Sequence, residues 1–313
     1  QISDNAIDII KKSDPPLLVE RSRIDHIKPG NLNDDFDEIK DADWVIEAVV
    51  ERIDIKHKLY SQIDKVRSPN SIISSNTSTI PLSILTQEMS DSMKADFCIT
   101  HFFNPVRFMR LLEIVETPTM NKDKMDGLRD FCKNELGKGI VNCNDTPGFI
   151  GNRIGVYAMQ VAMYEALERG LPVEIADALF GRPLGIPKTG VFGLYDLIGI
   201  DLMKDVLASF KKELQENDPF MDVVKPHPLV EKLLEKGFNG NKGPGGFYQT
   251  TIVEGDEHVK AMNTSDMSYY DFDKVDLEIA RRVEKEGIKA LLDDDSEYGR
   301  YAFAVLAKII NYS

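Results

Sequence analysis

The sequence lacks both the long apolar runs of a membrane protein and the residue spacings of a metal site. No apolar run approaches the roughly 20 residues that cross a bilayer, so we expect no membrane insertion. The five histidines are scattered without an HxxxH or similar pattern, which predicts that the protein holds no metal. We recognise no secretory signal at the start of the chain.

Positive charge is also scarce. The 313 residues include 52 acidic and 38 basic side chains, a net charge of -14. We therefore expect no nucleic-acid partner, because nucleic acids require a basic face. The three cysteines, Cys98, Cys132 and Cys143, have no metal-ligand spacing and cannot form an even disulfide framework. They indicate reduced thiols and predict a cytoplasmic location.

The first half of the chain alternates strand and helix patterns. Apolar strand patterns occur at residues 43–51, 71–74, 96–103, 110–117 and 140–145, with helical patterns between most of them. This alternation is typical of an α/β fold with a doubly wound, Rossmann-type parallel sheet.

The second half shows helical patterns and no convincing strand. Thr146 suits the N-cap of a long helix, and Pro147 suits its first position. We therefore predict an α/β domain over residues 1–146 and an all-helical domain over residues 147–313.

Polar residues gather where the predicted strands end, and open α/β sheets bind ligands at that edge. They are Glu51, the Ser/Thr/Asn run at 75–79, His101, Asn104 and, in the adjoining strand, Glu113. Each has a structural alternative, since Glu51 can cap a helix and the 75–79 run can be turn material. His101 can be a satisfied core residue, and Glu113 a solvated one. Their convergence on one edge favours a functional site.

The residue types at this edge favour oxidation of an alcohol. A histidine can take a proton from a hydroxyl group, and a nearby carboxylate orients the imidazole and stabilises its cation. His101 and Glu113 provide such a pair. No GxSxG nucleophile motif is present, and Ser78 and Asn152 are better suited to donate hydrogen bonds to a substrate oxygen. Hydride would then pass to a nicotinamide.

Six motifs resemble the L-3-hydroxyacyl-CoA dehydrogenase family in order and spacing. They are DWVIEAVVERIDIKHKLY (43–60), SNTSTIPLS (75–83), HFFNPVRFMRLLEIVE (101–116), DTPGFIGNRIG (145–155), GRPLGIPKTGVFGLYDLIGID (181–201) and KGPGGFY (242–248). The resemblance covers almost the whole chain and is strongest to long bacterial fatty-acid β-oxidation proteins, which add an enoyl-CoA hydratase module. It implies NAD-dependent oxidation of L-3-hydroxyacyl-CoA to 3-ketoacyl-CoA.

The resemblance also implies catalytic roles. The family's catalytic histidine matches His101, its partner glutamate matches Glu113, and the serine that binds the substrate's 3-oxygen matches Ser78. The asparagine of the DTPGFIGNR motif matches Asn152. By this likeness His101 takes the 3-hydroxyl proton as hydride passes to NAD.

Further positions match the family's cofactor contacts. These are Glu51, Lys56, Asn104 and Ser78. Arg107 and Arg110 are our own inference from the residues, because arginine forks suit the phosphates of CoA in an otherwise acidic protein. The alternative is that both arginines are solvated loop residues.

The sequence departs from the family in one important way, because it contains no GxGxxG phosphate-binding turn. Gln1 corresponds to a point just after the family's first strand–helix–strand unit. Residues 298–313 resemble the start of a second helical repeat that is cut short. The alternative function is therefore an inactive, truncated fragment that keeps the fold and part of a CoA-ester binding or assembly surface.

The family resemblance also implies which partners to expect. We expect an acyl-CoA substrate. We also expect the helical half to contact a second copy of the chain, a missing helical repeat or a hydratase module.

Overall fold

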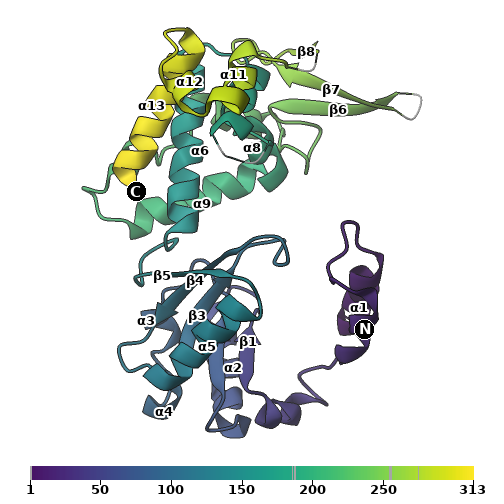
Figure 1. Cartoon of the computed structure of the whole chain (residues 1–313), viewed down its shortest axis with the longest axis vertical. Helices are drawn as coiled ribbons and strands as arrows, with labels where there is room; N and C mark the ends of the chain where they lie inside the picture. The colour runs from purple at the N-terminus through teal and green to yellow at the C-terminus, as the bar shows by residue number, and fades with distance from the viewer. Residues whose placement is uncertain (1, 185, 187, 254–255, 274) are drawn as a thin grey trace. The chain divides into compact units, whose positions relative to one another are not determined.

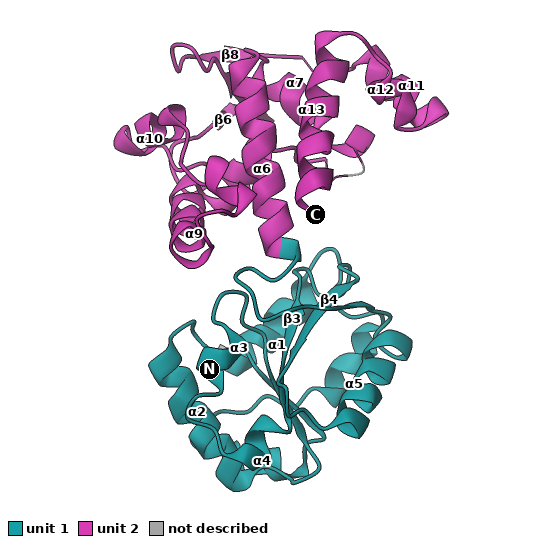
Figure 2. Ribbon diagram, turned by 90° about the vertical axis from the view of Figure 1, so that its left-hand side faces the viewer, with its two compact units in different colours: residues 1–151 teal, residues 152–313 magenta. Residues whose placement is uncertain are grey.

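The computed structural model describes residues 2–184, 186, 188–253, 256–273 and 275–313. The chain forms two compact units, residues 1–151 and residues 152–313, coloured separately in Figure 2. Each unit has a hydrophobic core of its own. The sequence motifs at 181–201 extend across positions 185 and 187, which lie outside the described residues.

Unit 1 is built around a sheet of five strands (Figure 1). The strands are β1 Trp44–Glu47, β2 Ile72–Ser75, β3 Phe97–Phe102, β4 Leu111–Glu116 and β5 Gly139–Asn142. The α-helices are α1 Ile2–Lys12, α2 Ile53–Val66, α3 Leu82–Leu85, α4 Asp91–Lys94 and α5 Lys122–Asn134, and the 3₁₀ helices are η1 Arg21–His26 and η2 Phe36–Asp41.

The sheet has the order β1-β2-β3-β4-β5. The predicted Rossmann-type α/β sheet followed by a helical domain is confirmed, but the strand direction differs at one pair. β1, β2 and β3 are mutually parallel, whereas β4 runs antiparallel to β3. Only the eight residues 103–110 join β3 to β4. A parallel crossover needs about a dozen residues or more, so this link can only form a hairpin.

Alternation along β3 packs each face of the sheet against a different helix. Phe97 and Ile99 are fully buried with residues of α2, whereas Cys98, between them, is buried with residues of α5. Figure 2 shows α2 and α5 on opposite faces of the sheet. Each large apolar side chain buried in this way contributes about 1.5–3 kcal/mol. Because the alternation continues to the end of the strand, His101 shares the face of Ile99.

The long helix that follows the sheet begins later than predicted. The helix is α6, Gly151–Glu168, and Thr146 and Pro147 precede it in a turn. Gly148 and Phe149 have φ values of 70° and 47°, which lie in the left-handed region that a right-handed helix excludes. The helix can therefore start only after Phe149, and the predicted helix start at Thr146-Pro147 is wrong by about one turn.

Unit 2 is mainly helical. Besides α6, its helices are α7 Val173–Leu179, α8 Phe192–Ile198, α9 Ile200–Glu213, α10 Pro228–Glu235, α11 Glu278–Glu286, α12 Lys289–Leu292 and α13 Glu297–Tyr312, with 3₁₀ turns η3 Arg182–Leu184 and η4 Pro219–Asp222. Figure 1 shows α13 beside α6, and the Tyr301 hydroxyl donates to the Ala162 carbonyl at 3.2 Å between them.

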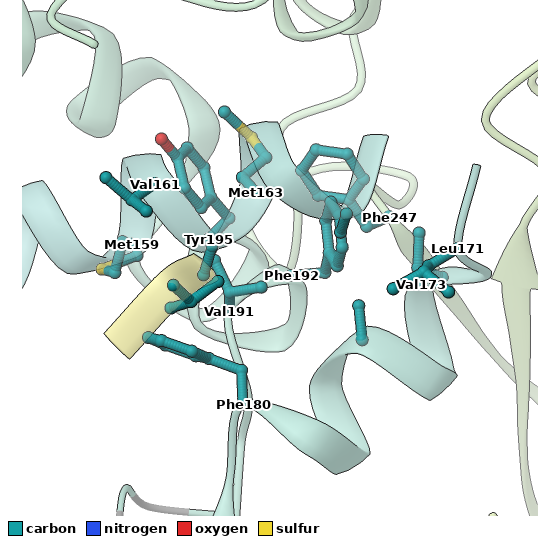
Figure 3. Packing of buried hydrophobic residues seen from close by; sticks show 14 of the residues in the cluster. Met159, Val161, Met163, Leu171, Val173, Phe180, Val191, Phe192, Tyr195 and Phe247 are labelled. Carbon is teal, nitrogen blue, oxygen red and sulfur yellow. The ribbon is translucent and has the colours of Figure 1, made fainter. Parts of the chain in front are cut away.

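The core of unit 2 is rich in aromatic side chains (Figure 3). Phe192, Tyr195 and Phe247 are almost fully buried, and the ring centroids of Phe192 and Phe247 lie 4.7 Å apart. Met159, Met163 and other aliphatic side chains fill the space around them (Figure 3). Unit 2 therefore has the separate hydrophobic core that is typical of a domain.

The prediction that the second domain is entirely helical is wrong. Unit 2 contains a three-stranded antiparallel sheet of β6 Tyr248–Val253, β7 Asp256–Met262 and β8 Tyr269–Asp271. Most side chains of β6 and β7 are exposed, so these strands lack the apolar alternation by which strands are recognised. Among the described residues, no helix combines the length and hydropathy needed to cross a membrane.

Candidate active site

β3 and β4 bring His101 and Glu113 together. The antiparallel register places the two residues directly opposite each other, so their side chains extend from the same face of the sheet. His101 Nδ1 lies 2.7 Å from Glu113 Oε2. His101 is 6% exposed and Glu113 is 0% exposed, so the pair is shielded from bulk water. The two residues predicted as base and orienting carboxylate are in direct contact.

Backbone groups hold the other oxygen of Glu113. Its Oε1 accepts the N–H of Ile150 at 2.9 Å and the N–H of Gly151 at 2.6 Å. Burial raises the pKa of Glu113, but the hydrogen bonds from His101, Gly151 and Ile150 outweigh burial and hold the pKa below its ordinary value. Glu113 is therefore ionised at neutral pH.

The ionised carboxylate fixes the tautomer of His101. A carboxylate can only accept hydrogen bonds, so the ring proton must lie on Nδ1. Nε2 is then the nitrogen with a free lone pair, and it is the one that can take a proton. The rings of Phe103 and Phe149 flank the imidazole, with centroids 4.5 Å and 5.8 Å away. These contacts restrict the imidazole to one orientation.

The segment after β2 supports the carboxylate of Glu51. The hydroxyl groups of Thr77 and Thr79 both donate to Glu51 Oε1, the latter at 3.0 Å. Burial raises the pKa of Glu51, but hydrogen bonds from Thr77, Lys56 and Thr79 and the charge of Lys56 outweigh burial and lower it. The side chain remains 39% exposed. Glu51 is thus an ionised acceptor at the carboxyl edge of the sheet.

Ser78 and Asn76 belong to the same segment. Ser78 is half-buried, and within the described part of the chain its hydroxyl has no hydrogen-bond partner. Asn76 belongs to the predicted 75–79 run but was given no role of its own. Its Oδ1 accepts the N–H of Phe102 at 3.0 Å, which ties the segment to β3 beside His101. The sequence feature that could have identified Asn76 is its position within the Ser/Thr/Asn run at 75–79.

The side chain of Lys56 is buried behind the carboxyl edge of the sheet and is not exposed at that edge. The side chain is 1% exposed, and Nζ lies 2.7 Å from Glu47 Oε1 and 3.2 Å from Glu51 Oε2. Glu47 also accepts the hydroxyl groups of Tyr60 at 2.6 Å and Ser75 at 2.7 Å. Glu47 was not predicted as a site residue, because it lies inside an apolar run of the sequence. Lys56 orients Glu51, and a direct contact with a cofactor stays a prediction.

The remaining predicted residues are less tightly placed. Asn104, Arg107 and Arg110 are exposed. Arg107 donates to the backbone carbonyls of Pro16 and, at 3.0 Å, Leu18, so its side chain helps to hold the N-terminal segment of unit 1 in place. Asn152 is the first residue of unit 2, and its place beside a substrate stays a prediction. No group of His, Cys, Asp or Glu side chains among the described residues could hold a metal ion.

Known proteins are similar to this chain over most of its length. Residues 5–146 match the family described as "3-hydroxyacyl-CoA dehydrogenase, NAD binding domain", and residues 148–250 match "3-hydroxyacyl-CoA dehydrogenase, C-terminal domain". A Deinococcus radiodurans protein named "Probable 3-hydroxyacyl-CoA dehydrogenase" is 35% identical over 243 residues, which cover 78% of this chain and 69% of that protein.

A longer relative comes from Rickettsia felis, and its name describes a fatty acid oxidation complex trifunctional enzyme. It is 38% identical over 312 residues, which cover 100% of this chain but 42% of that protein. The chain therefore spans about two fifths of the length of this relative.

Solved structures give the same assignment. The crystal structure of 3-hydroxybutyryl-CoA dehydrogenase from Escherichia coli has a TM-score of 0.66 and 29% identity, covering 79% of this chain and 52% of that one. The structure of Mycobacterium tuberculosis FadB2 has a TM-score of 0.61 and 26% identity, covering 79% and 82%. Together with the buried His–Glu pair, these matches show that the chain belongs to the 3-hydroxyacyl-CoA dehydrogenase family.

Proposed function

We propose that this chain performs the NAD-dependent oxidation of L-3-hydroxyacyl-CoA to 3-ketoacyl-CoA, as the dehydrogenase portion of a fatty-acid β-oxidation protein. The observation that carries the proposal is the buried His101–Glu113 pair, in which Nδ1 is bound by an ionised carboxylate and Nε2 is left as a base. The names of the relatives from Rickettsia and Deinococcus support the same substrate class.

His101 and Glu113 perform the proton transfer in this proposal. Nε2 of His101 removes the proton from the 3-hydroxyl group while hydride leaves C3. The negative charge of Glu113 stabilises the imidazolium that forms, and a positioned base of this kind contributes roughly 10²–10⁴ in rate. Ser78, whose hydroxyl is uncommitted, donates a hydrogen bond to the 3-oxygen, and Asn152 provides a second donor.

The residues at the carboxyl edge fit one end of NAD. Ionised Glu51 can accept ribose hydroxyl groups, and the Ser78 hydroxyl and the exposed Asn104 amide offer donors and acceptors for the nicotinamide carboxamide. NAD, when bound, supplies the hydride acceptor. Residues 1–313 contain no GxGxxG turn for the pyrophosphate. Arg107 and Arg110 lie in the link after His101, and we assign them to the phosphates of CoA.

The second candidate is a non-catalytic fragment that keeps the fold and part of a CoA-ester binding or assembly surface. The absence of a GxGxxG turn from the sequence favours it, because without a phosphate cradle the edge residues hold only part of the cofactor. This candidate predicts an acyl-CoA interaction without NADH binding.

A titration with NADH separates the two candidates. The dehydrogenase predicts saturable NADH binding by fluorescence and NADH oxidation when acetoacetyl-CoA is added. The matched variant is His101→Asn, whose amide can still donate to Glu113 and keeps that carboxylate paired. We expect it to bind NADH with unchanged affinity and to lose about 10²–10⁴ in kcat. Absence of saturable NADH binding by the wild-type chain would refute the dehydrogenase and leave the fragment.

Two broader assignments belong to this proposal. We assign the protein to the cytoplasm, in keeping with its three free thiols. We also assign to unit 2 a contact with a second copy of the chain, a further helical repeat or a hydratase module. Light scattering of the purified chain tests for the second copy, since a monomeric mass at micromolar concentration would exclude a stable homo-oligomer.

A further inference from the structure

A buried cation lies at the joint between α5 and β5. Lys138 is 7% exposed, and burial lowers the pKa of its ammonium group. No carboxylate among the described residues pairs with it. Its Nζ instead donates to two backbone carbonyls, those of Val106 and Met109, the latter at 2.8 Å. Burying a charge is unfavourable unless it is well bonded. These two carbonyls, together with the Phe102 ring, whose centroid lies 5.6 Å from Nζ, stabilise the charge in the site.

Both carbonyls belong to the turn that joins β3 to β4. The turn is closed by the N–H groups of Phe108 and Met109, which donate to the Pro105 carbonyl at 2.9 Å and 3.0 Å. Its apolar side chains contribute little packing, because Val106, Phe108 and Met109 are 44%, 46% and 40% exposed. The ammonium of Lys138 therefore anchors a turn whose apolar side chains are only partly buried, and Arg107 adds bonds to the Pro16 and Leu18 carbonyls.

The anchored turn closes the hairpin that carries His101 and Glu113. It begins three residues after His101 and ends four residues before Glu113. We propose that Lys138 is a positioning residue, whose bonds to the Val106 and Met109 carbonyls hold the hairpin closed and keep His101 opposite Glu113. Lys138 does not touch the imidazole, so it acts through the backbone of the turn. The kinetic part of this inference rests on the proposed dehydrogenase function.

The kinetic test compares Lys138→Met with Lys138→Arg. We expect Lys138→Met to lower kcat by about 10–100-fold, since a 1 Å misplacement of reacting groups can have effects of this order. The loss should fall on kcat more than on the Kd for NADH, because Asn104 is the one assigned cofactor contact in the turn, whereas Glu51 and Ser78 lie outside it. Lys138→Arg keeps the charge and the donors and should recover most of the activity. Equal kcat in Lys138→Met and the wild type would overturn the inference.

Lys124 provides the matched control. Its Nζ also donates to a backbone carbonyl, that of Pro69 at 2.6 Å, and to Asp96 at 2.6 Å. These contacts lie next to the start of β3, at the opposite end from His101. Lys124→Met removes the same atoms as Lys138→Met and should lower the unfolding temperature without lowering kcat. If both variants lose activity in proportion to their stability, Lys138 has a purely structural role.

Limited trypsin digestion tests the anchor without any enzyme activity. Arg107 and Arg110 lie in or just after the turn and are exposed. Loosening the turn should raise the rate of cleavage at these two bonds by about 10-fold in Lys138→Met and leave it unchanged in Lys124→Met. Unchanged cleavage in Lys138→Met would refute the anchor. Faster cleavage in a chain that does not oxidise NADH would keep the anchor and refute the dehydrogenase.

Discussion

Glu113 decides which nitrogen of His101 is basic. In Glu113→Gln, the amide can donate to Nδ1 and so move the ring proton to Nε2, where it blocks proton uptake. We expect kcat to fall by roughly 10²–10⁴, measured by NADH oxidation with acetoacetyl-CoA. Glu116→Gln is the control, because Glu116 lies in the same strand but pairs with Arg129. A Glu113→Gln enzyme as fast as the control would remove Glu113 from the mechanism.

Gly151 is constrained by the ring beside the histidine. A Cβ at Gly151 would lie 2.6 Å from Cζ of Phe103, and the Phe103 ring centroid is 4.5 Å from that of His101. We expect Gly151→Ala to reduce the free energy of unfolding by about 1–3 kcal/mol through overpacking, measured in urea, and also to reduce kcat. Adding Phe103→Leu should restore part of both losses. If it restores neither, the clash is not with Phe103.

Single residues were predictable where their chemistry is distinctive. His101 and Glu113 were predicted as a pair from their residue types and the family resemblance. The structure shows that they touch, and the contact depends on the antiparallel pairing of β3 with β4, which was not predicted. Glu47 was not predictable, because an acid inside an apolar run gives no sign that Lys56 and Tyr60 will converge on it. Lys138 was equally hidden, since its partners are backbone carbonyls, which every residue possesses.

At the scale of elements, the positions of strands were easier to predict than their directions. Every strand of unit 1 falls within or at the edge of an apolar run, because buried strands require apolar side chains. The direction of β4 depends on the length of the link between β3 and β4. That length predicts a hairpin, but the prediction of a parallel sheet did not take it into account. The strands β6 and β7 have mostly exposed side chains, so their pairing is set by backbone hydrogen bonds that leave no apolar pattern.

Asp177 acts as a distant cap for α8. Its carboxylate accepts the N–H groups of Phe192 at 2.7 Å and Gly193 at 2.8 Å and the Tyr248 hydroxyl at 2.9 Å. The cap lies fifteen residues before Phe192 in the chain. No local capping pattern could therefore have revealed it.

Burial gives this cap a pH dependence. It raises the pKa of Asp177 from 3.8 to about 7, against the hydrogen bonds from Phe192, Gly193 and Tyr248. The folded state therefore binds the proton more tightly than the unfolded state, and this group's contribution to the free energy of unfolding falls as pH rises between about 4 and 7. Asp177→Asn should flatten that slope in urea unfolding followed by circular dichroism. An unchanged slope would show that Asp177 does not titrate in this range.

At the scale of the whole molecule, the two units have separate cores. Trp44 is the only tryptophan of the chain and lies in β1 of unit 1, where its indole N–H donates to Ser74 at 2.9 Å. Its fluorescence therefore reports on unit 1, whereas far-UV circular dichroism is dominated by the helices of unit 2. We expect the two signals to give different urea midpoints. Coincident midpoints would mean that the units unfold as one.

The order of the two halves of the molecule could be predicted from the sequence more reliably than single contacts or strand directions. The order of an α/β half and a helical half follows from the change in periodicity, which depends on many residues and tolerates local errors. The start of α6 was misplaced because two residues with left-handed backbone angles, Gly148 and Phe149, intervene before it. A phenylalanine rarely adopts such angles, so the left-handed conformation of Phe149 could not be predicted from the sequence.

The β3–β4 hairpin makes the proposed proton-transfer pair a local feature of the chain. His101 and Glu113 are twelve residues apart in sequence, so bringing them together closes a short loop. The entropy lost on closing a loop grows only as about (3/2)RT ln n with its length n, and short loops of about ten residues close within roughly 10–100 ns. The contact can therefore form early in folding, before the distant segments around Gly151 arrive to complete the carboxylate's hydrogen bonds.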